Sequence, residues 1–203
     1  MINNVFPTKS NLLQAKHSLS LAQLGYELLD KKRNIMLREM MSLMEDIAGV
    51  QDQIDITFSE AYAALQKANF TIGQSEVLNV INAQEYPDDV TIQFKSIMGV
   101  EIPIVKLDVQ PASLHYGFAF TNSMLDDAYI KFLKVKQLTA MLAAIENSVY
   151  RLAFAIKQAQ KRANALKNIV IPRLEETIGF ITGYLEEKER ESFTVLKVIK
   201  KSK

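Results

Sequence analysis

An apolar heptad repeat that runs from Leu12 to Ala68 without a break constrains this chain most. Only Arg33 and Thr57 are polar at its core positions. The a positions are Leu12, Leu19, Tyr26, Arg33, Met40, Ile47, Ile54, Ala61 and Ala68, and the d positions are Ala15, Ala22, Leu29, Met36, Leu43, Val50, Thr57 and Ala64. A repeat held over about eight heptads is typical of a long coiled-coil helix and exceeds what an ordinary globular helix needs.

Start and stop signals bound this first helix. Pro7 and Thr8 precede it, and Thr8 is a favourable N-cap residue. The segment Asn69–Gly73 supplies the stop, because glycine readily adopts the backbone conformation that ends a helix. The sequence therefore predicts an N-terminal coiled-coil helix over residues 1–69.

A second periodic segment begins after the cap residues Thr121, Asn122 and Ser123. Its seam alternates steps of four and three residues and is entirely apolar: Leu138, Leu142, Ile145, Val149, Leu152, Ile156, Ala159, Ala163, Leu166 and Val170. Near Pro172 the steps lengthen to four and four, a stutter that locally unwinds a supercoil, and proline removes a helix hydrogen bond. Residues 124–203 are therefore predicted to form a continuous helix that bends near Pro172.

Residues 70–123, between the two helices, hold six of the twelve glycine and proline residues: Gly73, Gly99, Gly117, Pro87, Pro103 and Pro111. Thr91–Ile97 and Ile102–Val109 are typical of strands, and the spacing between them predicts a β-hairpin over about 91–109. The predicted fold class is mainly α: a long antiparallel two-helix coiled coil with a small α/β head containing the hairpin. Antiparallel pairing places Tyr26 and Leu29 near Leu166 to Val170.

Composition argues against chemistry carried by this chain alone. There is no cysteine among the 203 residues, and the seven glycines form no phosphate-binding loop. His17 falls at a solvent-facing heptad position, and His115 lies in the head. Asp88-Asp89 and Asp126-Asp127 stand at turns or helix starts, where aspartate is expected for capping. We expect no catalytic, cofactor-binding or metal-binding residues and no cofactor.

Charge is separated along the chain although the net charge is only +1. Residues 1–40 and 160–203 together carry +7, and the residues between them carry −6. If the ends fold together, one pole is basic and the other acidic. The sequence shows neither a signal peptide nor an apolar run long enough to span a membrane, which predicts a cytoplasmic location.

Arg33 is the anomaly of the first seam, since it places a cation at an a position beside Lys31 and Lys32. Its aliphatic stem could pack while the guanidinium reaches water. Alternatively it fixes the register of the helix pair, or its face leaves the partner helix to meet a third surface.

Short motifs throughout the chain resemble one family. Pro7-Thr8-Lys9, Leu24-Gly25-Tyr26 and Lys31-Lys32-Arg33 are similar to the opening of the D subunit of the V-type and A-type rotary ATPases. Ile97-Met98-Gly99-Val100 followed by Pro103 resembles the hairpin of its bacterial and archaeal members. Further matches lie in the closing segment: Arg162, Asn164-Ala165-Leu166, Ile171-Pro172-Arg173-Leu174, Leu185-Glu186-Glu187, Glu189-Arg190-Glu191, Phe193 and Leu196-Lys197.

The resemblance implies a non-catalytic central-stalk subunit that couples ATP hydrolysis or synthesis to ion translocation by rotation. Its implied partners are the hexamer of A and B subunits, the small F subunit and the stalk subunit that caps the membrane ring. The soluble sector would hold it peripheral to the membrane, without membrane insertion and without nucleic acid. Expected contacts with the hexamer collar are Lys9, Lys31, Lys32, Arg33, Arg173 and Arg190. Expected contacts of the head with a partner are Ile97, Met98, Gly99 and Val100.

One alternative from another class stays open, a free-standing antiparallel coiled coil that acts as a structural rod or tether. A rod at a membrane surface should carry a basic stripe along one face. Here the charge separates by pole instead.

Overall fold

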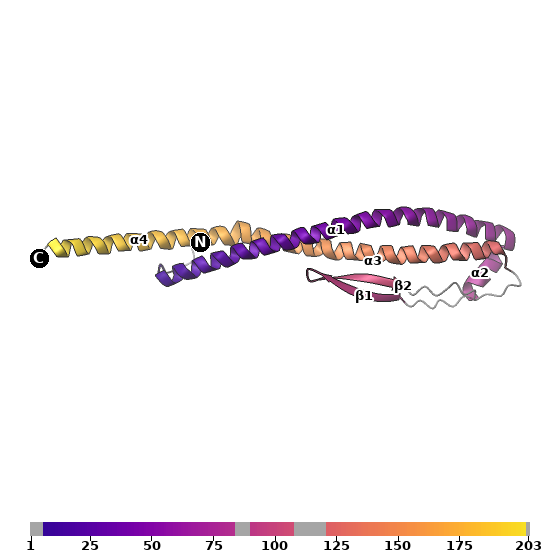
Figure 1. Ribbon diagram of the computed structural model, residues 1–203, viewed down its shortest axis with the longest axis horizontal. Helices are drawn as coiled ribbons and strands as arrows, with labels where there is room; N and C mark the ends of the chain where they lie inside the picture. The colour runs from indigo at the N-terminus through magenta and orange to yellow at the C-terminus, as the bar shows by residue number, and fades with distance from the viewer. Residues whose placement is uncertain (1–5, 84–89, 108–120, 202–203) are drawn as a thin grey trace. The chain divides into compact units, whose positions relative to one another are not determined.

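The computed structural model describes residues 6–83, 90–107 and 121–201. Two long helical segments dominate it, and a short helix and a two-stranded sheet lie between them in the sequence (Figure 1). The elements are α1 (Lys9–Ile72), α2 (Gln74–Ala83), β1 (Val90–Ile97), β2 (Val100–Leu107), α3 (Ser123–Ala165), a π-helical turn (Leu166–Val170) and α4 (Ile171–Lys201). The predicted fold class, a mainly α coiled coil with a small β-hairpin, is confirmed.

The chain forms two compact units, each containing parts of both long helical segments. We call Met1–Ile35 with Ile156–Lys203 the terminal unit and Met36–Ala155 the central unit. The predicted three-part division into residues 1–69, 70–123 and 124–203 follows the sequence patterns instead, and it stays a prediction.

In the terminal unit, α1 pairs with the second helical segment in antiparallel fashion. The Lys167 Nζ atom lies 5.8 Å from the centroid of the Tyr26 ring. Further toward the N-terminus, Lys9 Nζ lies 3.2 Å from Glu189 Oε1. Residue numbers thus rise on one helix as they fall on the other, and the predicted placement of Tyr26 near Leu166 to Val170 is confirmed.

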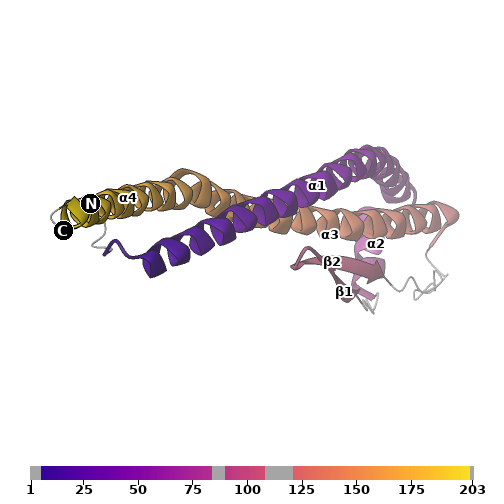
Figure 2. The same cartoon turned by 60° about the vertical axis from the view of Figure 1, so that its left-hand side comes forward.

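The central unit shows the same antiparallel pairing between α1 and α3 (Figure 2). The rings of Tyr62 and Phe132 meet edge to face with centroids 5.7 Å apart. Near the end of α1, Asn122 Nδ2 donates to Thr71 Oγ1 at 2.9 Å. An aromatic edge-to-face pair of this kind adds about 1 kcal/mol beyond the area it buries.

The predicted seam is the side of α1 that is withdrawn from solvent. Every a and d position from Leu12 to Ala68 is buried or half-buried. The largest fully buried side chains are Met36, Leu152 and Ile181, and the first two stand at predicted seam positions. The polar d residue Thr57 donates its hydroxyl to the carbonyl oxygen of Gln53 at 2.6 Å, which satisfies it within its own helix.

Capping residues set the helix boundaries where the sequence predicts them. The Thr8 hydroxyl accepts a hydrogen bond from the Asn11 N–H at 3.2 Å. Gly73 ends α1 with φ +94° and donates to the carbonyl of Asn69 at 3.1 Å. At the start of α3, the Asn122 Oδ1 atom accepts from the N–H groups of Met124 and Leu125 at 3.1 and 3.2 Å. Each contact satisfies a backbone group that a helix end leaves unpaired.

The π-helical turn lies directly before Pro172, where the seam spacing lengthens. Ile171 N–H bonds to the carbonyl of Leu166, five residues back, instead of four. A wider turn holds the extra seam residue on the same face, and proline removes the next donor in any case. The predicted irregularity is therefore present, while a bend at this point stays a prediction.

A small apolar core joins α2 to the two long helices. Ala68, Val77 and Leu125 are buried together, with Leu65, Ile72 and Val80 packed against them. Because Gly73 turns the chain sharply, α2 can fold its apolar side against the ends of α1 and α3. This core fixes the start of the head.

The strands β1 and β2 form an antiparallel pair in an unbroken register from Val90 opposite Leu107 to Ile97 opposite Val100. Met98 and Gly99 form the two-residue turn, with φ values of +52° and +78°. Positive φ at both central residues is the feature of the tight turns that match strand twist. The hairpin is confirmed, but β2 begins two residues before the predicted Ile102. The predicted end at Val109, like Asp88-Asp89 and His115, lies outside the described residues.

Candidate interaction surfaces

The hairpin is attached to α3 through the outer edge of β2. The Arg151 Nη1 atom donates to the carbonyl oxygen of Glu101 at 3.0 Å. The Ser148 hydroxyl donates to the carbonyl oxygen of Pro103 at 3.4 Å. The Arg151 guanidinium also lies 5.7 Å from the centroid of the Phe94 ring, within range of a cation–π interaction. Views from two directions agree that β2 lies between α3 and β1 (Figures 1 and 2).

Small residues on α3 permit this close approach. Ala144 and Ser148 stand one turn apart and are both buried, and Ile102 of β2 is buried at 5% exposure. The Ser148 hydroxyl also bonds the carbonyl of Ala144 at 2.8 Å, so its buried oxygen is satisfied. The hairpin therefore has a defined seat on the helix.

Apolar side chains of the hairpin remain exposed. Val90, Ile92 and Phe94 alternate along β1 with exposed fractions of 47%, 55% and 58%. A strand normally turns its apolar side inward, so an exposed apolar row of this kind is typical of an interaction surface.

The residues predicted to contact a partner lie at the tip of the same hairpin. Met98 and Gly99 are exposed in the turn, and Ile97 and Val100 flank it half-buried. The structure thus brings all four together, and their role in binding stays a prediction.

The basic residues predicted to meet a collar all belong to the terminal unit but do not form one cluster. Lys9 is paired with Glu189, and both side chains are largely exposed. Lys31 is exposed and Lys32 half-buried. Lys9 and Lys31 are separated by 22 positions of α1, about 33 Å along a helix. Arg173 and Arg190 are exposed on α4.

Arg33 differs from the other predicted contacts because it faces the partner helix. Its Nη1 atom donates to Gln160 Oε1 at 2.6 Å, and its Nη2 atom forms an ion pair with Asp30 Oδ1 at 2.6 Å. Asn34 Oδ1 accepts two further bonds from the same guanidinium. Gln160 in turn donates to Asn164 Oδ1 at 3.0 Å. We call these five residues the polar layer; it favours the register interpretation of Arg33 over a snorkelling side chain.

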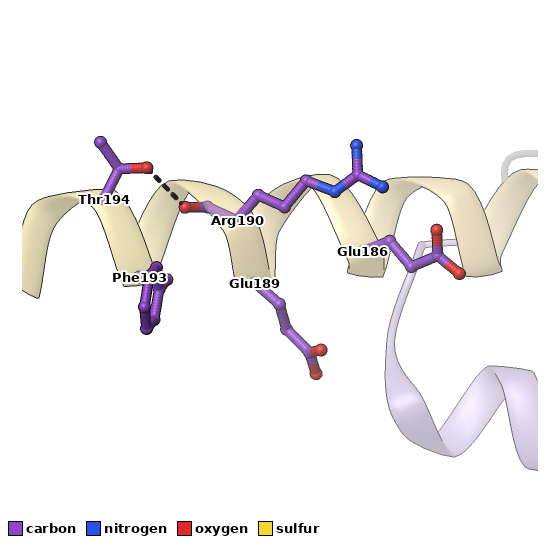
Figure 3. A pocket seen from close by; sticks show the side chains of 5 residues that line it. All are labelled: Glu186, Glu189, Arg190, Phe193 and Thr194. Carbon is purple, nitrogen blue, oxygen red and sulfur yellow. Dashed lines mark hydrogen bonds between the residues drawn. The ribbon is translucent and has the colours of Figure 1, made fainter.

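A shallow surface on α4 gathers both signs of charge. It is lined by Glu186, Glu189, Arg190, Phe193 and Thr194, all exposed residues of one helix (Figure 3). The Thr194 hydroxyl donates to the carbonyl of Arg190 at 2.9 Å. Side chains from one face of a single helix enclose no volume in which a reaction could be shielded from water.

Two absences hold for the residues that the structure describes. Within them, no three His, Asp or Glu side chains are grouped as a metal site would require. None of the helices described contains an apolar stretch long enough to cross a bilayer.

The charge separation is sharper by structural unit than by sequence segment. The terminal unit holds 16 basic and 8 acidic residues, a net charge of +8. The central unit holds 8 basic and 15 acidic residues, a net charge of −7. Over long range, the terminal unit should therefore attract acidic macromolecules and the central unit should attract basic ones.

The sequence patterns predict neither the seat of the hairpin nor the partners of Arg33. One signal for the seat was available, because Ala140, Ala144 and Ser148 repeat at four-residue spacing outside the predicted seam. No comparable signal marks Gln160, which becomes a partner of Arg33 only once the register is known.

Comparison with known proteins assigns the chain to a family. The family model for the D subunit of ATP synthase matches residues 11–201. The D subunit of a V-type ATP synthase from Thermotoga neapolitana is 42% identical over 197 residues, covering 97% of each chain. The D subunits of the A-type ATP synthases from Methanosphaera stadtmanae and Pyrococcus furiosus are 34% and 33% identical, covering 99% and 98% of this chain and 95% and 94% of their own.

These matches extend over nearly the whole chain, so they include both long helices and the hairpin. The fold is that of a subunit built around a helical pair. The chain belongs to the family of ATP synthase D subunits, and it is a subunit of a rotary V/A-type ATPase.

Proposed function

We propose that this chain is the central-stalk subunit of its ATPase and turns inside the catalytic hexamer. In this role it couples ATP hydrolysis or synthesis in the A and B subunits to ion translocation by rotation, and it carries out no catalysis itself. The observation that carries the proposal is the match to the D-subunit family along the full chain, combined with two antiparallel helices that share one buried seam. A helical pair of this kind transmits torque because its seam resists slippage.

The terminal unit is the part that we place within the hexamer. Its net charge of +8 suits a collar of opposite potential, and Lys31 is exposed for contact at the rim. The contribution of Arg33 is to hold the helix pair in register, since its guanidinium is occupied by Asp30 and Gln160. Lys9, Lys32, Arg173 and Arg190 complete the proposed collar contacts.

The central unit is the part that we place outside the hexamer. Its hairpin holds the small F subunit, and the adjoining end docks on the subunit that caps the membrane ring. The chain thereby stays peripheral to the membrane, in the cytoplasmic sector of the complex. The exposed apolar side chains of β1 support a protein partner for the head.

A rotation assay tests this function directly. Because the chain has no cysteine, a single Ser59→Cys change on the exposed side of α1 gives one attachment point for a bead. Co-expression with the A and B subunits should yield a complex in which the bead turns on addition of ATP, pausing at three angles for the three catalytic interfaces. A bead that stays still while the same complex hydrolyses ATP would contradict the axle role.

Charge reversal tests the placement of the terminal unit. Changing Lys31 and Lys32 to Glu lowers the net charge of this unit from +8 to about +4 and should slow assembly with the A and B hexamer at low salt. The matched control changes Lys67 and Lys134, exposed residues of the central unit, to Glu. Equal assembly rates for the two double variants would refute attraction through the terminal unit.

The mass of the isolated chain distinguishes the central-stalk function from the alternative, a homodimeric rod or tether. Light scattering should report a monomer of 23.0 kDa if the seam is satisfied within one chain. A stable dimer that persists in the presence of A and B subunits would favour the tether.

A further inference from the structure

The two outer edges of the hairpin differ in a way that points to a specific kind of partner. Beside the turn, Ile97 pairs with Val100, and the strands continue in regular register from there. In an antiparallel pair joined by a two-residue turn, the pair beside the turn and every second pair beyond it exchange backbone hydrogen bonds. Gln93 and Lys95 therefore bond inward to β2. Ile92, Phe94 and Ser96 direct their N–H and C=O groups away from it.

Side-chain contacts on the opposite strand verify this assignment. Glu101 and Pro103 are the register partners of Ser96 and Phe94. Their carbonyl groups point outward, because they meet Arg151 and Ser148 of α3. Proline at position 103 removes an N–H only from this outer edge, so the hairpin ladder loses nothing. The β2 edge is thus covered by α3 at Glu101 and Pro103 and lacks one of the donors that a further strand would need.

Within the described part of the chain, the β1 edge has neither form of protection. Among the residues that the structure describes, no hydrogen-bond partner meets the outward groups of Ile92, Phe94 and Ser96. The strand contains no proline and no bulge, the usual devices that prevent an edge from pairing. Its charged residue, Lys95, stands at an inward-bonding position. Val90, Ile92 and Phe94 form an exposed apolar row beside the open edge.

We propose that β1 accepts an extended segment of the F subunit, which adds a third strand to the sheet. This proposal rests on the proposed function, because that function places a protein partner on the head. The added strand would have apolar residues at alternate positions, so that they continue the row formed by Val90, Ile92 and Phe94. One strand alone buries less area than a stable interface needs, so the donor must be a subunit that contacts this chain elsewhere as well.

Amide hydrogen exchange, resolved by residue, reads the added strand directly. The probe is the F subunit of the same ATPase, and exchange is compared for the chain alone and for the two-subunit complex. Protection of the Ile92, Phe94 and Ser96 amides should rise at least about tenfold on binding, while Gln93 and Lys95 are protected in both states. Unchanged exchange at the three outward amides in a stable complex would overturn the proposal.

A proline substitution at the open edge separates backbone pairing from side-chain contact. Ile92→Pro removes one outward donor, and the hairpin already tolerates proline at an outward position in Pro103. The matched control is Ile92→Thr, which keeps the N–H and a β-branched side chain. Affinity for the F subunit should fall at least about tenfold for Ile92→Pro and less than about threefold for Ile92→Thr.

Replacing residues 91–107 with a short flexible linker distinguishes failure of this inference from failure of the proposed function. If the linker variant loses the F subunit but Ile92→Pro keeps it, the hairpin binds through its side chains, and strand addition is wrong while the function stands. If the linker variant binds normally, the head is not the site of this partner and both proposals fail at that point. A dimer of the isolated chain that Ile92→Pro dissolves would assign the edge to a second copy and overturn strand addition by a partner.

Discussion

The terminal and central units use the same pair of helices but stabilise it by different contacts. In the terminal unit, the buried side chains are small apart from Ile181, and the polar layer spans the two helices. In the central unit, an aromatic pair and a larger set of buried apolar residues hold the helices, with Met36 and Leu152 fully buried. Apolar packing supplies free energy with little preference for register, whereas a polar contact at one seam position penalises slippage. The comparison indicates that the central unit supplies most of the stability of the helix pair, whereas the terminal unit fixes its register.

We expect the largest change in stability in the central unit, where apolar packing holds the helices together. Leu152→Ala removes a fully buried side chain from the central unit and should lower the free energy of unfolding by about 3 kcal/mol. Leu196→Ala, at a residue 64% exposed in the terminal unit, is the control and should change it by less than about 0.5 kcal/mol. Urea denaturation followed by helical circular dichroism measures both. Similar losses for the two variants would show that burial does not determine how much each side chain contributes to the free energy of unfolding.

The polar layer should give an intermediate effect. Arg33→Glu breaks the contact with Gln160 and places a second carboxylate beside Asp30, at a cost of about 2 kcal/mol in the free energy of unfolding. Lys31→Glu makes the same charge change at an exposed position two residues away and should cost under about 0.5 kcal/mol. The same denaturation experiment compares them. If Arg33→Glu proves as mild as Lys31→Glu, the layer contributes little and the register must be fixed by packing.

Register itself can be measured apart from stability. The hydrophobic Arg33→Leu variant removes the penalty for slippage, so cysteines introduced at Tyr26 and Lys167 should crosslink less selectively than in the parent chain. This variant should lose only about 1 kcal/mol in the free energy of unfolding, because Asp30 keeps the hydrogen bond from Asn34 and 31% of its side chain is exposed to water. Unchanged selectivity would locate the register signal elsewhere in the seam.

Sequence periodicity predicted the helices, the seam and the pairing because each depends on repeated local patterns. Thr8, Gly73 and Asn122 could be assigned as boundary residues since caps and helix stops act within one turn of the chain. The seat of the hairpin could not be predicted, because Arg151 reaches Glu101 through a contact across 50 residues. For the same reason, the sequence predicts partner contacts at the hairpin tip but does not predict the open edge of β1. Which edge is open depends on where α3 lies.

The smallest expected effects concern glycine, and their opposite signs test the two units against each other. Gly25 lies inside α1 in the terminal unit, and a Cβ atom built there would be 3.6 Å from Leu166 Cδ1, an ordinary contact distance. Gly25→Ala should therefore raise the free energy of unfolding by up to about 1 kcal/mol, the intrinsic difference between the two residues in a helix.

Gly73 ends the same helix in the central unit with φ +94°. A Cβ at Gly73 would meet no atom within 4 Å, so the penalty for alanine comes from the backbone conformation alone. Gly73→Ala should lower the free energy of unfolding by about 1 kcal/mol. The two melting curves should thus shift in opposite directions from the parent. Destabilisation by Gly25→Ala would mean that α1 and the π-helical turn approach more closely than the contact at Leu166 indicates, and the terminal unit would then depend on packing as much as the central unit does.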